Sequence, residues 1–233
     1  MKYCIVEIRT QTATFRNPEF QNFHKTLPIP PPTTMVGIAG AALGRSPSAS
    51  QLFFEESDFL MGSYCRTQGT STDLWKYNDF SQRSIILKEI LFQNHIILVY
   101  GSEDLSKIDT LKGAFSNPIY SLTMGNSDSL AKIVSIKVED SLIESNLVAY
   151  CLIEGDVIEE VISNASNGID FSIYSTSDPV TMDLPTRFAY SDEYGMRSVS
   201  RRKQFSLITA EMKLNVKKKG IFYQSCFIPL FKY

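Results

Sequence analysis

Acid–base chemistry near neutral pH can rest on only two histidines, His24 and His95. His95 lies between apolar segments that read as strands, which favours a structural role. His24 is followed directly by Lys25 in a polar and aromatic stretch. A metal-independent ribonuclease needs a base for a ribose 2′-hydroxyl and a cation for the phosphorane, and His24, Lys25 and a tyrosine can supply both. A surface His–Lys pair that makes contacts and nothing more is the commoner case, so both interpretations stay open.

A second set of residues mixes aromatic rings with basic side chains. It comprises Phe15-Arg16 and a polar segment that contains Arg66, Trp75, Lys76, Tyr77 and Arg83. Proteins hold single-stranded RNA with rings or guanidinium planes that stack on bases and with cations that meet phosphates. The alternative is a surface loop whose rings fold back into the core, and the sequence alone favours neither.

The glycines of Gly37-x-x-Gly40-x-x-x-Gly44 raise the question of a phosphate loop. The run lacks the G-x-x-x-x-G-K-[ST] spacing and does not follow a strand as G-x-G-x-x-G, so a nucleotide-hydrolysing site is not expected. Close packing of a helix against a sheet is the better explanation. The Thr33-Thr34 end of that helix can still offer N–H groups to one RNA phosphate.

Patterns for metals, cofactors and secretion are missing from the sequence. The cysteines at positions 4, 65, 151 and 226 are scattered without C-x-x-C, which predicts reduced thiols. No ligand spacing is present, so we expect no metal and no cofactor. The first residues lead into a predicted strand rather than a signal peptide, and no apolar run could cross a membrane. These features predict a cytoplasmic protein without a membrane partner.

The elements that could position these residues follow from the hydrophobic spacing of residues 1–138. The order is strand, helix, strands, helix, strand, which fits a β-α-β-β-α-β sheet with both helices on one face. This is the ferredoxin-like or RRM-like arrangement, an α+β fold. Helices are predicted at 33–44, with Thr33 or Thr34 as N-cap, and at 103–115, with Ser102 as cap. Strands are predicted at 2–9, 59–66, 84–92 paired with 96–100 as a hairpin, 119–124 and 133–138.

The rest of the chain, residues 139–233, is predicted to be a β-rich subdomain. The last two predicted strands form a hairpin that turns through Lys217-Lys218-Lys219-Gly220. The predicted strands are 147–153, 168–174, 205–216 and 220–228.

Charge is unevenly distributed along the chain, although the net charge is only −2. Residues 134–194 carry 2 Lys/Arg and 12 Asp/Glu, and residues 195–233 carry 9 Lys/Arg and 1 Asp/Glu. One polarised face could meet phosphates and the other a basic partner protein. Alternatively the two blocks lie side by side and neutralise each other.

A proline-rich segment precedes the glycine run. The residues are Phe15-Arg16-Asn17-Pro18, then Leu27-Pro28-Ile29-Pro30-Pro31-Pro32-Thr33-Thr34, then Gly37, and Gly40-Ala41-Ala42-Leu43-Gly44. This series resembles the "Cas-five" group of CRISPR RAMP proteins, especially its type I-B branch. In that family a strand leads through F-R-x-P and P-x-P-P-T-T into a Gly-Ala helix.

Three later matches occur in the family's order, so the resemblance covers nearly the whole chain. Lys88-Glu89-Ile90-Leu91 resembles the basic-Glu-x-Leu segment that leads into the family's third strand. Asn117-Pro118-x-Tyr120-x-x-x-Met124-Gly125-Asn126-Ser127-Asp128 resembles a turn after its second helix. Leu184-Pro185-x-Arg187-Phe188 is similar to a late L-P-x-x-F element.

The resemblance implies an RRM-like domain at 1–138 with a protruding thumb at about 64–84, followed by the β-rich part at 139–233. It also implies a crRNA-binding subunit of the antiviral Cascade complex that caps the 5′ handle of the guide RNA. The partners would be a backbone subunit and the large PAM-reading subunit, with target DNA engaged indirectly through guide pairing. The RNA contacts predicted from both lines of reasoning are Phe15, Arg16, Thr33, Thr34, Arg66, Trp75, Lys76, Tyr77, Arg83, Asn126 and Ser127.

One branch of the family cuts precursor crRNA with a Tyr, Lys and His set. In this chain His95 has no lysine beside it, and His24-Lys25 precedes the first predicted helix without matching that set. The departure favours a non-catalytic subunit, and the endoribonuclease with His24 and Lys25 is the alternative.

Overall fold

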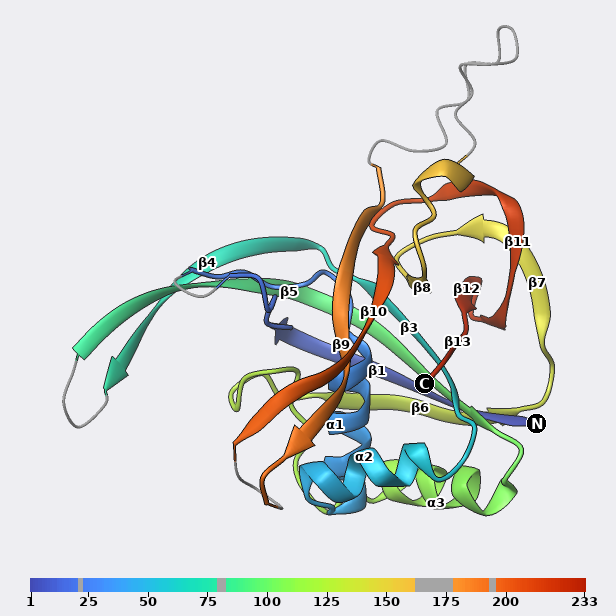
Figure 1. The fold of residues 1–233 in the computed structure, drawn as a ribbon, viewed down its shortest axis with the longest axis horizontal. Coiled ribbons are helices and arrows are strands. Elements are labelled where there is room, and N and C mark those ends of the chain that lie inside the picture. The colour runs from blue at the N-terminus through green and yellow to red at the C-terminus, as the bar shows by residue number, and fades with distance from the viewer. Residues whose placement is uncertain (21–22, 79–82, 162–177, 193–195) are drawn as a thin grey trace, which may run out of the picture.

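The computed structural model describes residues 1–233 except for 21–22, 79–82, 162–177 and 193–195 (Figure 1). Within the described residues, no helix is both long and apolar enough to span a membrane. The predicted strand at 168–174 lies outside the described residues.

A twisted antiparallel sheet forms the centre of the molecule. Its strands run in the order β13-β3-β5-β1-β6. Two further strands of the sheet, β2 (Phe23–His24) and β4 (Gly69–Asn78), pair with β5 outside this path. Without the C-terminal β13, the four strands of the path lie in the chain order second, third, first, fourth, which is the ferredoxin-like order and confirms the predicted α+β fold class. The strands are β1 (Lys2–Ala13), β3 (Leu60–Arg66), β5 (Arg83–Ser102), β6 (Lys132–Glu139) and β13 (Phe231–Lys232).

Three helices cover one face of this sheet (Figure 1). They are α1 (Pro32–Leu43), α2 (Pro47–Glu55) and α3 (Leu105–Ser116). Alternate residues of β1, including Val6 and Ile8, join the core beneath the helices, while Tyr3 and Ile5 face the other side. The sheet therefore has a helix-covered face and a second face, part of which packs against Ile221, Tyr223 and Ile228 of the C-terminal part.

The helix ends differ from the predicted caps at their N-termini. Helix α1 begins at Pro32 with Pro31 as N-cap, because a proline at the first position needs no hydrogen bond for its nitrogen. The predicted caps Thr33 and Thr34 lie inside its first turn. Gly44 ends the helix at φ 68°, as expected for a C-terminal glycine. Asp104, rather than Ser102, caps α3 through the Ser106 N–H.

Strand β5 corrects the predicted hairpin of 84–92 and 96–100. It is one strand of 20 residues. Its first part pairs with β4 (Gly69–Asn78) and its second part pairs with β1 and β3, so partners on both sides keep it extended. Only Gln93, with φ 52°, interrupts its regular geometry. The β4–β5 hairpin extends away from the body as an arm (Figure 1). The short strand β2 (Phe23–His24) pairs with Leu87 and Lys88 of β5, within this arm.

The predicted strand at 119–124 is wrong. The backbone N–H groups of Ile119 and Tyr120 donate to the carbonyls of Ala42 and Ala41 at the end of α1. These residues therefore complete the C-terminus of a helix instead of joining the sheet.

The remaining chain forms two small sheets, β8-β10-β9 and β12-β11-β7. Tyr150, with φ 51°, separates β7 from β8 inside the predicted strand 147–153. Lys217-Lys218-Lys219-Gly220 is part of β11 rather than a turn, since Lys218 and Lys219 pair with β7. The elements are β7 (Ile143–Val148), β8 (Leu152–Glu154), η1 (Ile158–Glu160), β9 (Val180–Tyr190), β10 (Arg197–Leu207), β11 (Met212–Tyr223) and β12 (Cys226–Pro229).

The two parts of the chain share one core. Leu184, Phe205 and Phe231 pack in the same buried cluster as the β1 and helix residues. The division at residue 138 into an RRM-like domain and a C-terminal subdomain stays a prediction.

Candidate nucleic-acid interface

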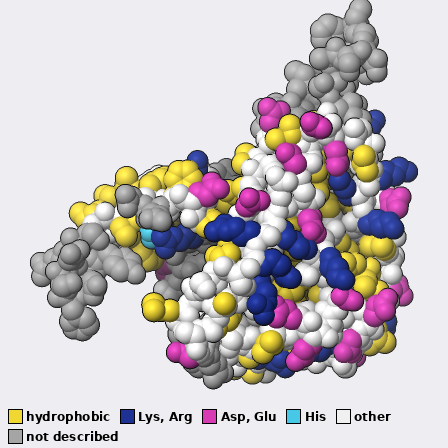
Figure 2. Space-filling model, in the orientation of Figure 1, with side chains coloured by type: hydrophobic (Ala, Val, Ile, Leu, Met, Phe, Trp, Pro, Cys, Tyr) yellow, Lys and Arg dark blue, Asp and Glu magenta, His cyan; other side chains and the backbone are white. Residues whose placement is uncertain are grey.

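The base of the arm gathers several of the predicted contact residues. His24 on β2 lies directly opposite Lys88 on β5 in a short parallel pair. The Lys88 ammonium lies 4.1 Å from the centre of the Trp75 ring and donates to the Asn126 side-chain oxygen. We call Arg16, His24, Trp75, Lys88 and Asn126 the arm-base cluster. Figure 2 shows basic side chains beside a histidine at this part of the arm.

Backbone and side-chain hydrogen bonds hold the 15–27 loop against β5. The Thr26 N–H donates to Glu89 Oε2 over 3.0 Å, and Thr26 Oγ1 accepts from the Phe15 N–H over 2.8 Å. The Leu27 N–H donates to the Phe15 carbonyl over 2.6 Å. The Thr26–Glu89 bond therefore fixes the loop that carries Arg16 and His24 beside the strand that carries Lys88.

The electrostatics of the arm-base cluster favour an anion. Burial lowers the pKa of His24, and the positive charges of Arg16 and Lys88 lower it further. Burial also lowers the pKa of Lys88, and so does Arg16, while Asp128 opposes them. Arg16 and Lys88 thus lie as two cations near His24, and a phosphate between them would relieve their repulsion.

The Trp75 ring supplies a surface for stacking. It is half-buried, and its indole N–H donates to Asp73 over 3.2 Å, which fixes the ring on the arm. Lys88 contacts the ring, as a cation over an aromatic face. A ring beside cations is the combination that unpaired nucleotides need.

Phe15 is a correction to the predicted contacts. Its side chain is 1% exposed and lies in the main core, so the ring is not presented to a ligand. The adjacent Arg16 is exposed. The two residues alternate in direction next to β1, which places the ring inside and the guanidinium outside.

Two other predicted groups lie away from the arm-base cluster. Thr33 lines a cavity with Phe188, Tyr190 and Arg197 of β9 and β10. The Thr34 N–H already donates to the Pro31 carbonyl, so it is not available to a phosphate as expected. Arg66 is exposed on β3 with its guanidinium 5.4 Å from the Tyr150 ring centre.

The remaining predicted residues follow the arm and its neighbouring turn. Lys76 on β4 is exposed, and so are Ser127 and Lys25. Tyr77 and Arg83 lie in the backbone of β4 and β5 near the arm tip, where the side chains are outside the described part of the structure. The expected polar loop at 64–84 is therefore mainly paired strand, and its role as a thumb stays a prediction.

Sequence reasoning missed Lys88 as a contact residue. It noted Lys88 only within a motif, because position 88 reads as an ordinary alternating residue of a strand. Two signals were available: the Lys88-Glu89 pair, whose glutamate holds the loop, and the position of Trp75 in the preceding strand. Their contact depends on the β4–β5 register, which the sequence alone does not give.

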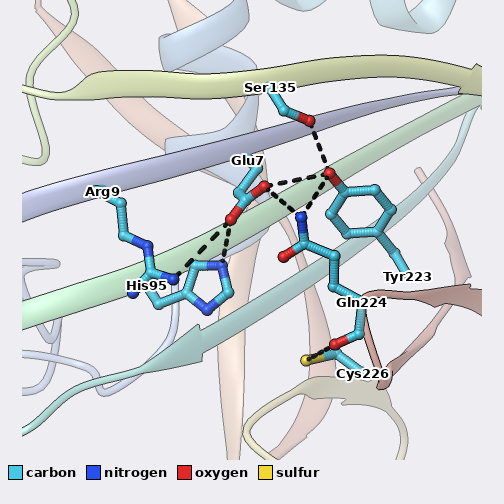
Figure 3. Close-up of polar contacts among 7 residues, drawn as sticks. All are labelled: Glu7, Arg9, His95, Ser135, Tyr223, Gln224 and Cys226. Carbon is cyan, nitrogen blue, oxygen red and sulfur yellow. Dashed lines mark hydrogen bonds and ion pairs between the residues drawn. The ribbon is translucent and has the colours of Figure 1, made fainter.

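A second polar cluster lies between the second face of the sheet and the β11–β12 turn, and it anchors that turn (Figure 3). The buried Glu7 carboxylate accepts from the Tyr223 hydroxyl over 3.1 Å and from the Gln224 amide over 2.9 Å. Its other oxygen lies 3.0 Å from His95 Nε2 and 4.0 Å from the Arg9 guanidinium. Since Glu7 is buried, the cluster fixes structure, which agrees with the structural role predicted for His95.

Acidic and basic blocks meet in direct ion pairs. Lys203 lies 2.9 Å from Glu154, and Lys218 lies 2.6 Å from Glu160. These contacts join residues of 195–233 to residues of 134–194, so part of the charge separation is neutralised within the molecule. Arg201 and Arg202 on β10 stay exposed.

Metal and thiol chemistry have little support in the described residues. No group of three or more His, Cys, Asp or Glu side chains there is placed to hold a metal ion. Burial raises the pKa of the Cys4 and Cys65 thiols to about 12, which makes both poor nucleophiles.

Comparison with known proteins gives structural matches only. A scan against protein-family models finds no match, and a search of the curated proteins finds none. A chain of a "CRISPR RNA-guided surveillance complex" aligns with TM-score 0.55 and 10% identity over 91% of both chains. A CRISPR protein from Archaeoglobus fulgidus aligns with TM-score 0.53 and 12% identity over 100% of both chains. This chain therefore shares its fold with solved CRISPR proteins.

Proposed function

We propose that this chain is the crRNA-binding subunit of a type I-B Cascade complex and holds the 5′ handle of the guide RNA. The observation that carries the proposal is the arm-base cluster, where Arg16, His24 and Lys88 converge beside the Trp75 ring. The fold shared with a chain of an RNA-guided surveillance complex supports it. Guide pairing would then supply target recognition.

Exposed apolar side chains on the arm support contact with neighbouring protein subunits. Leu74, Ile85 and Leu87 are 66%, 72% and 46% exposed. Leu74 and Leu87 lie opposite each other in the β4–β5 pair, so they share one face, and Ile85 follows on the same face two residues away. Water-exposed apolar groups gathered in this way favour burial by a partner, and the backbone and PAM-reading subunits are the partners we propose.

The salt dependence of RNA binding tests the arm-base cluster and the separately predicted contact Lys76. We expect Arg16→Ala, Lys76→Ala and Lys88→Ala each to weaken binding of a single-stranded 20-nucleotide RNA. Each should also reduce the slope of log K against log salt by roughly one counterion. Lys213→Ala, an exposed lysine on β11, is the matched control and should leave the slope unchanged. Equal slopes in all four variants and the wild type would contradict the proposed site.

An endoribonuclease is the second candidate, and the state of His24 favours it. Burial, Arg16 and Lys88 hold the pKa of His24 low, so the imidazole is neutral and able to act as a base. Neutral His24 would take the proton of a ribose 2′-hydroxyl, whose oxygen attacks the adjacent phosphorus. A 2′,3′-cyclic phosphate forms, and the 5′-oxygen leaves with a proton from solvent. Lys25 or Lys88 would stabilise the phosphorane.

Incubation with repeat-containing RNA in EDTA separates the two candidates. The binding subunit leaves the RNA intact. A specific cut that is lost in His24→Ala and kept in His95→Gln would show that the chain is a nuclease and overturn the non-catalytic assignment.

A further inference from the structure

A cleft lies between α1 and the β9–β10 pair, where β9 crosses the helix and contacts it (Figure 1). Its volume is about 260 Å³, just below the range of small-molecule pockets, so it has room for one flat ring system rather than a large ligand. We call it the α1–β9 cleft. No residue of the arm-base cluster lines it. The lining includes Gly37, Arg45, Tyr120, Phe188, Tyr190 and Arg197.

Small side chains form the α1 wall of the cleft. Thr33, Gly37 and Ala41 line it and are spaced four residues apart, which places them on one face of the helix. A side chain on Gly37 would enter open space, since a Cβ there meets no atom within 4 Å. A flat group can therefore approach the helix closely at this point.

Phe188 and Arg197 form the opposite wall, and the Phe188 backbone is anchored to α2. The Phe188 N–H donates to Gln51 Oε1 over 2.8 Å, and Gln51 Nε2 donates to the Phe188 carbonyl over 3.1 Å. Gln51 is 5% exposed, so this contact is shielded from water. The Arg197 guanidinium lies 4.5 Å from the centre of the Phe188 ring. The ring and the guanidinium therefore form a pre-organised platform.

The charges in the cleft favour an anionic ligand. Arg45 and Arg197 line it and are exposed, and no Asp or Glu is among its described lining residues. Figure 2 shows a group of basic side chains at the centre of this face, where β9 and β10 lie in front of α1 in Figure 1. A ligand that carries a flat ring and a negative charge in one unit fits this lining best.

We propose that the α1–β9 cleft binds one unpaired nucleotide of a single-stranded nucleic acid. A nucleotide joins a flat ring to an anion. Its base lies against the α1 wall and stacks on the Arg197–Phe188 platform, since bases stack on guanidinium planes as well as on rings. Arg45 contacts the adjoining phosphate.

The cleft offers stacking rather than contacts that read a base edge. The Gln51 amide, which could read a base, is engaged by the Phe188 backbone through both its oxygen and its nitrogen. We therefore expect little preference among the bases. RNA and DNA share the ring and the phosphate, so either can supply the nucleotide. The inference goes beyond the proposed function, because it assigns a second contact that does not depend on the arm-base cluster.

Photocrosslinking with 5-iodouracil tests the inference on the full chain. Two nonamers carry this base at the central position, one an RNA of uridines and the other a DNA of deoxyuridines. We expect one or both to crosslink to Tyr120, Phe188 or Tyr190, which are aromatic residues of the cleft. Gly37→Leu fills the open space above α1 and should reduce these crosslinks on the order of tenfold.

Gly113→Leu is the matched control for this variant. Gly113 is also an exposed helical glycine whose Cβ would meet no atom within 4 Å, but it lies on α3. The substitution should leave the cleft crosslinks unchanged.

A second variant makes the test independent of the packing of α1. Arg45→Ala/Arg197→Ala removes two exposed side chains and should also reduce the cleft crosslinks on the order of tenfold, while crosslinks at Trp75 stay the same. Melting temperatures check that each variant is folded.

The crosslinks separate failure of this inference from failure of the proposed function. Cleft crosslinks from only one oligomer would support the inference and identify RNA or DNA as the source of the nucleotide. Absence of cleft crosslinks from both oligomers, or cleft crosslinks undiminished in either folded variant, would overturn the inference. Trp75 crosslinks in that case would leave the proposed function standing. Cleft crosslinks without any on the arm would support the inference and contradict the proposed function.

Discussion

Histidine protonation is unfavourable at both titratable positions of this molecule, for the same physical reasons. Burial lowers the pKa of His24, and Arg16 and Lys88 add to the shift. Burial also lowers the pKa of His95, with Arg9 and Arg66 in the same sense and Glu7 in opposition. The folded protein therefore favours neutral imidazoles at both sites.

These shifts predict a loss of stability in mild acid. Unfolded histidine binds protons below a pH of about 6.5, while the folded sites resist them, so the unfolding free energy falls as the pH drops through this value. Urea unfolding between about pH 8 and about pH 5.5 measures the effect. The double variant His24→Gln/His95→Gln should show a flatter profile. A wild-type protein that gains stability on acidification, or a double variant with the same profile, would contradict this account.

Individual side-chain directions limited what the sequence could predict at this scale. The neighbouring residues Phe15 and Arg16 were both predicted as RNA contacts. Phe15 is in the core, whereas Arg16 is exposed. Trp75 was predicted as an RNA contact because its segment mixes aromatic and basic residues. It lies on the arm, but its partner Lys88 was not identified from the sequence. Direction and partner depend on packing with residues distant in sequence, which local composition does not record.

Helix α1 shows how two glycines of one motif have different tasks. A Cβ on Gly40 would overlap the hydroxyl of Ser50 on α2, while a Cβ on Gly37 would meet no atom within 4 Å. The close approach is therefore between two helices, whereas the sequence predicted packing of a helix against the sheet. Gly37 is exposed.

Paired substitutions test this assignment. Gly40→Ala should lower the unfolding free energy by about 1–3 kcal/mol, because α1 and α2 must separate. Gly37→Ala should raise it by up to about 1 kcal/mol, because alanine loses less backbone entropy in a helix. Urea midpoints of the two variants measure both effects. The assignment would be wrong if the two substitutions had the same sign and size.

Element prediction succeeded where the signal is local. The end of α1 follows from Gly44 alone, and β1, α1, β3, α3 and β6 follow from hydrophobic spacing, whereas α2 and β4 were not predicted. Strand β5 was divided in two and Lys217-Lys218-Lys219-Gly220 was assigned to a turn, because continuity of a strand depends on its partners. Those partners, β4, β1 and β7, are set by the whole fold.

At the scale of the whole molecule, the arm continues the central sheet, since β5 is part of both. The arm carries Trp75 and Lys88, and the sheet places the exposed residues Arg66, Arg9 and Lys132 in one register on β3, β1 and β6. Part of the acidic block is neutralised within the molecule, since Glu154 and Glu160 form ion pairs with lysines of the C-terminal segment. The net charge of the chain therefore gives little sign of its RNA surface, and the distribution of charge in three dimensions gives more.

Ultraviolet crosslinking of the full chain to single-stranded guide RNA, with crosslinked peptides identified by mass spectrometry, tests the central claim most directly. The account predicts crosslinks at Trp75 and in the peptides that contain Arg16 and Lys88. It also predicts that Lys88→Ala reduces the Trp75 crosslink and that the control Lys213→Ala leaves it unchanged. Crosslinks confined to β7–β8 and β11–β12, or none on the arm, would contradict it.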